Sequence, residues 1–169
     1  MTRTHRPFLI WPDPRLATPA APVAEITDDI RAIWDEMIRA MEAMPGVGLA
    51  APQLGIPLRL AVVDASSQRG QAIRLANPEV VSAAPVMSRR DEASPNLPGV
   101  SASIARPAAV TLRYLDAEGR ERMGDFEGLW ATSVQHQIDH FEGRMFFDRL
   151  SPVKRRMLLA RAAKLRRRG

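Results

Sequence analysis

Between residues 27 and 45, apolar side chains recur at intervals of three and four, the spacing of one helical face. The apolar positions are Ile30, Ile33, Trp34, Met37, Ile38, Met41 and Met44. Thr27 is a suitable N-cap, and the two acidic residues after it suit the positive end of a helix dipole. Pro45 and Gly46 end the pattern. We predict an amphipathic helix here, with methionines that fill the core.

The apolar pattern then changes to short runs typical of strands. These runs cover residues 58–64, 71–76, 79–83, 101–105 and 109–115. Turn-forming residues separate them at 66–70, 77–78 and 116–119. The middle of the chain is therefore predicted to form a sheet of several strands.

Helical spacing returns near the C-terminus. A second helix fits residues 126–141, with Leu129, Val134, Ile138 and Phe141 on its apolar side. A third helix fits the tail, about 152–168, whereas the proline-rich start should run as extended chain and turns. This order predicts an α+β fold with helices packed against antiparallel sheet, in one domain over residues 1–169.

Composition narrows the class of protein. The chain has 169 residues and 46% hydrophobic residues, enough to build one core. It has no cysteine, which excludes disulfides, thiolate metal ligands and a cysteine nucleophile. No run approaches a membrane span or a signal peptide. We expect a cytoplasmic protein with neither a membrane nor DNA as a partner.

The net charge of +5 is concentrated in the tail. Residues 152–169 carry eight basic residues and no acidic one, while the rest of the chain has a small excess of acid. Such a tail favours binding to phosphate or to an acidic surface. The alternative is that it only keeps the protein in solution.

Two histidines could hold a metal ion. His136 and His140 are four residues apart, so a helix places them on one face. The alternative is a pair of buried histidines with structural hydrogen bonds. Asp139 could orient an imidazole or form a surface salt bridge. The H-E-x-x-H pattern of zinc proteases has a glutamate where this chain has Gln137, and an amide cannot shuttle a proton near neutral pH.

A second candidate segment is rich in small residues. Residues 46–53 contain two glycines and two alanines, followed by Gln53, whose side-chain amide can donate hydrogen bonds. Small residues allow the backbone to approach a ligand or another strand closely. A tight turn packed in the core would produce the same pattern.

Together, these segments resemble the peptide deformylase family, metallohydrolases that remove the formyl group from the N-terminal methionine of nascent proteins. The resemblance runs through Pro12–Leu16, residues 46–53, residues 92–98, residues 135–140 and residues 147–149. Residues 92–98 stand where the family has an E-G-C-L-S-like segment and a proline, and residues 135–140 where it has Q-H-E-x-D-H. The resemblance implies antiparallel sheets around a central helix that bears the histidine pair, with further helices at both ends.

The resemblance also implies a metal site, but with replaced residues. His136 and His140 stand where the family has two metal ligands, and Ser94 stands at the position of its cysteine ligand. A neutral hydroxyl is a weak ligand, so we expect one divalent ion, Fe²⁺ or Zn²⁺, bound weakly or not at all. Gln53 matches one oxyanion donor. Pro95 stands where the family uses a backbone N–H, which proline lacks.

Further roles follow from the same resemblance. Gln137 stands at the catalytic glutamate. Val47, Gly48, Leu97 and Ile138 lie near the family's pocket for the methionine side chain. Asp91 or Glu92 could replace the missing ligand, although we favour a structural salt bridge from Glu92 to Arg106.

Two functions remain open. We expect a deformylase-like protein whose activity is lost or strongly reduced. It would still bind N-terminal peptides of nascent chains, or the ribosome and its RNA through the basic tail. The alternative is an active metal-dependent deformylase or amidase with an altered metal site.

Overall fold

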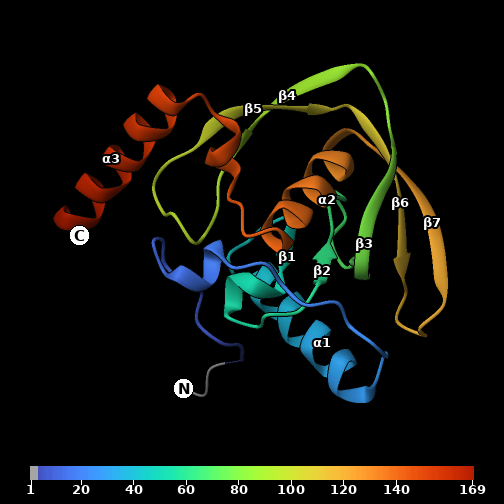
Figure 1. Cartoon of the computed structure of the whole chain (residues 1–169). Coiled ribbons are helices and arrows are strands. Elements are labelled where there is room, and N and C mark those ends of the chain that lie inside the picture. The colour runs from blue at the N-terminus through green and yellow to red at the C-terminus, as the bar shows by residue number, and fades with distance from the viewer. Residues whose placement is uncertain (1–3) are drawn as a thin grey trace.

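Helix α2 (Gly128–Phe141) lies at the centre of the computed structural model, which describes residues 4–169 (Figure 1). One antiparallel sheet has the strand order β1 (Gly48–Ala50), β2 (Leu60–Val63), β3 (Ile73–Ala83), β6 (Ala109–Leu115) and β7 (Glu121–Glu127). A second sheet pairs β4 (Met87–Glu92) with β5 (Ala102–Pro107). Helix α1 (Asp28–Ala43) lies at one end of the molecule and α3 (Pro152–Arg168) at another. The expected α+β fold is confirmed.

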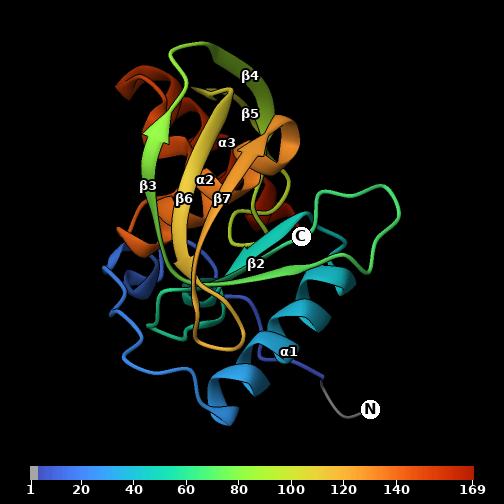
Figure 2. The ribbon, with the colours of Figure 1, turned by 90° about the vertical axis from the view of Figure 1, so that its right-hand side faces the viewer.

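Strand β2 is buried on both faces because it lies between two helices. Leu60 and Val62 pack in the same apolar cluster as the side chains of α1. Ala61 and Val63 point the other way and pack with α2. Side chains alternate along a strand, so a continuous apolar run covers both faces at once. Figure 2 shows β3, β6 and β7 continuing this sheet upward beside α2.

The predicted helices are present, with one boundary to correct. The side chain of Thr27 accepts a hydrogen bond from the Ile30 N–H, so it caps α1 as expected. Helix α2 starts at Gly128, whose φ is +60°, and not at residue 126. Phe126 belongs to β7, which pairs with β6. A glycine in the left-handed region is what lets the chain turn from strand to helix here.

The strand predictions need two corrections. Residues 71–76 and 79–83 are not separate strands, because β3 runs from Ile73 to Ala83 through the expected turn. Asn77 takes φ +50° and the pairing register shifts there, so a local irregularity replaces the turn. Strands β1, β4 and β7 were not predicted, because β1 is only three residues long and β4 and β7 have no apolar run. Their positions follow from pairing with neighbours, since β4 and β7 are mostly exposed and polar.

The two chain ends are attached differently. The N-terminal segment is extended apart from η1 (Pro14–Ala17), as expected, and it bonds to the body through backbone contacts of Leu9 and Trp11. Helix α3 projects from the body in Figure 1, and its buried residues are Leu158 and Ala162. Most of its basic side chains therefore face solvent. Within residues 4–169, no helix is long and apolar enough to cross a membrane.

Candidate functional site

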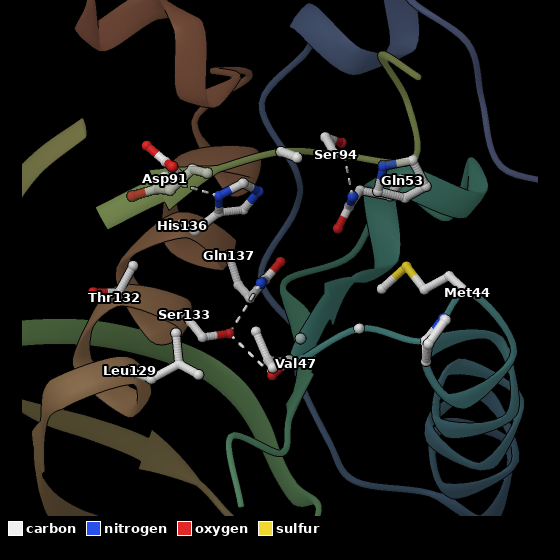
Figure 3. Close-up of a pocket in the computed structure, with 16 residues that line it drawn as sticks. Met44, Val47, Gln53, Asp91, Ser94, Leu129, Thr132, Ser133, His136 and Gln137 are labelled. Atoms are coloured by element: carbon white, nitrogen blue, oxygen red, sulfur yellow. Dashed lines mark hydrogen bonds and ion pairs between the residues drawn. The ribbon is translucent and has the colours of Figure 1, made fainter. Parts of the chain in front are cut away.

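A cavity of about 420 Å³ lies between α2, the segment before β1 and the segment after β4. Residues from all three parts line it, including Met44, Val47, Gly48, Gln53, Asp91, Ser94, Pro95, Leu129, Ser133, His136 and Gln137. Figure 3 shows His136 and Gln137 reaching into it from the helix, opposite Ser94 and Gln53. His136 and Gln137 are consecutive residues of α2, and the chain reversals at η2 (Ala51–Leu54) and residues 94–97 place Gln53 and Ser94 opposite them.

The two histidines lie together, with ring centroids 5.1 Å apart. Nδ1 of His136 donates a hydrogen bond to Oε1 of Glu92 at 2.8 Å, which leaves Nε2 on the opposite side of the ring. His140 is only 1% exposed, and neither of its ring nitrogens has a hydrogen-bond partner. Burial, and next the nearby His136, lower the pKa of His140 well below its usual 6.5. His140 is therefore a neutral imidazole with a free lone pair.

Glu92 belongs to a buried network of ion pairs. Its carboxylate accepts hydrogen bonds from Nε and Nη2 of Arg106 at 2.7 and 2.9 Å. Burial alone would raise the pKa of Glu92, but the hydrogen bonds from His136 and Arg106 outweigh it and lower that pKa. The carboxylate is therefore ionised and engaged on both oxygens. The expected salt bridge to Arg106 is confirmed, and Glu92 is held away from a ligand role.

Asp139 extends the same network through Arg106. It accepts a hydrogen bond from Nη1 of Arg106 at 2.9 Å and two from Arg149, at 2.7 and 2.8 Å. Burial would raise the pKa of Asp139, but Arg149 and Arg106 outweigh it and lower that pKa. Asp139 is only 5% exposed, so its salt bridges are buried ones and it does not orient an imidazole directly.

Gln137 has an unused acceptor beside the cavity. Its Nε2 donates to Oγ of Ser133 at 3.4 Å, while Oε1 has no partner although the residue is only 4% exposed. Ser133 in turn donates to the backbone carbonyl of Val47 at 3.1 Å. Gly48 packs so close to this pair that an added Cβ would overlap both Ser133 and Gln137. The small residues of this segment thus serve close packing against the helix that carries the site.

Ser94 and Gln53 meet at a third residue, Asn96. Oδ1 of Asn96 accepts hydrogen bonds from Nε2 of Gln53 at 2.7 Å and from Oγ of Ser94 at 3.0 Å. The Asn96 N–H also donates to the Ser94 hydroxyl at 3.1 Å. Asn96 is fully buried and is not among the residues that the motifs single out. An asparagine two residues after a serine is a turn signal, which is the one sequence feature that points to it.

Six of the predicted site residues line one cavity, while Leu97, Ile138 and His140 do not. The six are Val47, Gly48, Gln53, Ser94, His136 and Gln137. Leu97 packs instead with the apolar cluster of Phe146 and Phe147, because the chain reverses between Ser94 and Leu97. Ile138 packs against the core cluster of Val134 and Phe141. The cavity is therefore formed without the two apolar residues that were expected in it.

Comparison with known proteins identifies the family. The family model described as polypeptide deformylase matches residues 5–156, most of the chain. The chain belongs to the peptide deformylase family. A peptide deformylase of Rhizobium meliloti is 41% identical over 163 residues, which cover 95% of this chain and 94% of the relative. A protein of Bradyrhizobium diazoefficiens named peptide deformylase-like is 38% identical, over 97% of this chain and 96% of that protein.

Solved structures of the peptide deformylase family show the same fold. The crystal structure of a peptide deformylase from Legionella pneumophila matches with a TM-score of 0.90 and 37% identity, covering 96% of each chain. The peptide deformylase of Ehrlichia chaffeensis matches with the same TM-score at 28% identity, over 96% of this chain and 97% of that one. The replaced residues therefore lie on an intact family scaffold.

The peptide deformylase family implies a divalent metal, and the residues here fit it only in part. The buried, unpartnered nitrogens of His140 and the free Nε2 of His136 suit a metal ion. Ser94 does not complete the set, because its hydroxyl is engaged with Asn96. Among residues 4–169 no three His, Asp or Glu side chains are grouped to hold a metal ion. A catalytic site of this type has three protein ligands, and the described residues offer candidates for two of them, His136 and His140.

Proposed function

We propose that this protein binds formylated peptide N-termini in the cavity and hydrolyses the formyl amide far more slowly than a family member with the complete residue set. The observation that carries this proposal is Gln137, a neutral amide with an unpartnered Oε1 at 4% exposure beside the histidine pair. A buried acceptor without a partner is costly unless a ligand supplies a donor. An amide N–H of a bound peptide is such a donor.

The cavity offers binding groups but no proton carrier at position 137. Oε1 of Gln137 accepts a hydrogen bond, and its Nε2 donates one to Ser133. Met44, Val47 and Leu129 give the same cavity an apolar wall, which suits an apolar side chain such as methionine. Gln137 has no basicity near neutral pH, so it positions a ligand or water and does not take up the proton that amide hydrolysis must move.

The size of the reduction follows from two replaced groups. Loss of a general base typically lowers the rate by about 10²–10⁴-fold. Loss of one oxyanion donor, here through Pro95, typically costs about 2.7–4 kcal/mol in the transition state. The two effects need not add, because both belong to one catalytic unit. We therefore expect a rate at least about 10²-fold below that of the restored site.

A second candidate is an active metal-dependent deformylase or amidase with an altered metal site. It is favoured by His140, whose two buried ring nitrogens lack partners, and by the relatives that are named peptide deformylases. When bound, Fe²⁺ or Zn²⁺ would supply Lewis-acid activation of water or of the carbonyl. His136 and His140 would hold the ion, and a third ligand would have to come from outside the present hydrogen-bond network.

Formate release from a formyl-methionyl peptide separates these candidates. The native chain is compared with the triple variant Ser94→Cys, Pro95→Leu, Gln137→Glu, both loaded with Fe²⁺ or Zn²⁺. We expect peptide binding by both and a rise of at least about 10²-fold in formate release in the triple variant. Equal, rapid turnover by both proteins would favour the second candidate. Absence of peptide binding to the native chain would refute the first.

We also propose that α3 docks on the ribosome near nascent chains. The support is the exposed face of α3, which carries most of the tail's basic residues and has no acidic one. Contacts with RNA phosphate weaken as salt rises. The variant Lys164→Gln, Arg167→Gln, Arg168→Gln should lose salt-sensitive co-sedimentation with ribosomes while it keeps the two buried anchors of α3, Leu158 and Ala162. Unchanged co-sedimentation would refute this role.

A further inference from the structure

We propose that Asn96 is a positioning residue that ties Ser94 and Gln53 into a closed hydrogen-bond network, and so lowers the metal affinity of the site by engaging the side chain at the third ligand position. This inference rests on the proposed function in taking this cavity as the ligand site. The hydrogen bonds of Asn96 are a second cause of the missing metal ligand, in addition to the replacement of cysteine by serine at position 94. The side-chain carboxamide of Asn96 lies between the two groups, fully buried.

The Ser94 hydroxyl has no hydrogen-bonding capacity left. A hydroxyl provides one donor and two acceptor lone pairs. Its proton goes to Oδ1 of Asn96 at 3.0 Å, and its oxygen accepts from the Asn96 N–H at 3.1 Å and from Nε2 of Gln53 at 3.4 Å. Binding a metal ion would require at least one of these bonds to break. Ser94 is therefore a weak metal ligand by residue type, and its hydroxyl is also engaged in hydrogen bonds within the protein.

Asn96 itself is fixed by the N-terminal segment. Its Nδ2 donates to the backbone carbonyls of Leu9, at 2.6 Å, and of Gln53, at 3.1 Å. The Asn96 carbonyl accepts from the Trp11 N–H at 2.8 Å, and the Leu9 N–H donates to the Gln53 carbonyl at 2.9 Å. All side-chain donors and acceptors of Asn96 are thus engaged. Rotation of the carboxamide would break several of them at once, so the network holds position 94 in place.

The same network engages the expected oxyanion donor. Nε2 of Gln53 donates to Oδ1 of Asn96 at 2.7 Å, and its Oε1 accepts from the Ala50 N–H at 2.9 Å. One N–H of the Gln53 side-chain amide is therefore already engaged in a hydrogen bond within the protein. A shorter side chain at position 96 would release this N–H together with the side chain at position 94. The two releases come from one substitution, which makes the inference testable.

Cobalt(II) binding tests the inference without peptide and without turnover. Four full-length proteins are titrated with Co²⁺: the native chain, Ser94→Cys, Asn96→Ser, and the double variant. The readouts are the visible absorption of bound cobalt and the thiolate-to-cobalt charge-transfer absorption of the cysteine variants. We expect the double variant to bind Co²⁺ about tenfold more tightly than the product of the two single effects predicts. Additive effects, within about twofold, would overturn the inference.

A matched control separates positioning from general loosening. Asn77 also bridges the N-terminal segment to the body, through the backbone N–H and carbonyl of Val23, both at 2.8 Å. It does not line the cavity. Asn77→Ser combined with Ser94→Cys should bind Co²⁺ like Ser94→Cys alone. If that control strengthens cobalt binding as much as Asn96→Ser does, a positioning role for Asn96 is refuted.

If the Asn96 variants fail to fold, the Co²⁺ affinity of Ser94→Cys alone still tests the inference. Ser94→Cys with Asn96 intact introduces the missing thiol into the closed network. We expect its affinity for Co²⁺ to exceed that of the native chain by less than about a hundredfold, with a weak charge-transfer absorption. A larger gain would overturn the inference. Since no peptide is present, this result is independent of whether formylated N-termini bind.

Discussion

Glu92 accepts a hydrogen bond from Nδ1 of His136 at 2.8 Å, and both residues line the cavity. This contact fixes the orientation of one imidazole, and the Arg106 guanidinium in turn fixes Glu92. A supporting carboxylate of this kind is characteristic of histidines that hold metal ions. His136 therefore has a support of this kind, although the groups at positions 94, 95 and 137 differ from the family's.

Arg106 should be essential to stability, because it neutralises two buried carboxylates. Its side chain is 1% exposed and pairs with Glu92 and Asp139. Arg106→Ala would leave buried charge uncompensated, and we expect a loss of about 3–5 kcal/mol in the free energy of unfolding. Urea unfolding measures this loss. Arg113→Ala, which breaks an exposed pair with Glu79, should cost less than about 1 kcal/mol; equal losses would contradict the account.

Gly48→Ala should disturb the site through packing. The added methyl group would overlap Ser133 and Gln137, so both side chains must shift. We expect a loss of about 1–3 kcal/mol in stability, and weaker binding of a formyl-methionyl peptide, because Gln137 is displaced from the cavity. Thermal unfolding and calorimetric titration measure the two effects. Adding Ser133→Ala removes one overlapping atom and should restore part of the stability; no recovery would contradict this explanation.

Asp116 should contribute a pH-dependent part of the stability. Hydrogen bonds from the Arg122 side chain, and next from the Arg120 backbone, lower the pKa of Asp116 to about 2. A lowered native pKa means that the stabilisation is complete above the unfolded value of 3.8 and is lost as pH falls toward 2. The stability difference between the native chain and Asp116→Asn should therefore shrink over that interval.

Unfolding by urea at several pH values between 5 and 2 measures this difference. Arg122→Gln removes the main cause of the shift and should weaken the same pH dependence. A difference between the native chain and Asp116→Asn that stays constant over this range would show that Asp116 has a similar pKa in the native and unfolded states.

The sequence predicts well those parts in which local pattern and tertiary structure agree. Helix α1 follows from its apolar period and Thr27, and strand β2 from its apolar run. Strands β4 and β7 could not be predicted, because their polar, exposed sequences form strands only by pairing with neighbours. The turn expected at Asn77 is absent because the strand continues through a local register shift.

The candidate site likewise contains some residues that the sequence predicts and others that it does not. The resemblance of residues 135–140 to the family's Q-H-E-x-D-H segment was enough to place His136 and Gln137 at one site, and both line the cavity. It could not place Leu97, whose direction depends on a reversal of the chain after Ser94. Nor could it reveal Asn96, whose partners at Leu9 and Gln53 are distant in the sequence. Contacts of this kind depend on the tertiary fold and leave little trace in local composition.

On the proposed function, the cavity binds a formylated N-terminus while Gln137 limits its hydrolysis. The most direct measurement follows binding of a formyl-methionyl peptide and release of formate in the same sample of metal-loaded native protein. We predict saturable binding at one peptide per chain, with formate released at least about 10²-fold more slowly than by the Ser94→Cys, Pro95→Leu, Gln137→Glu variant. Formate release by the native chain as fast as by that variant would contradict the claim.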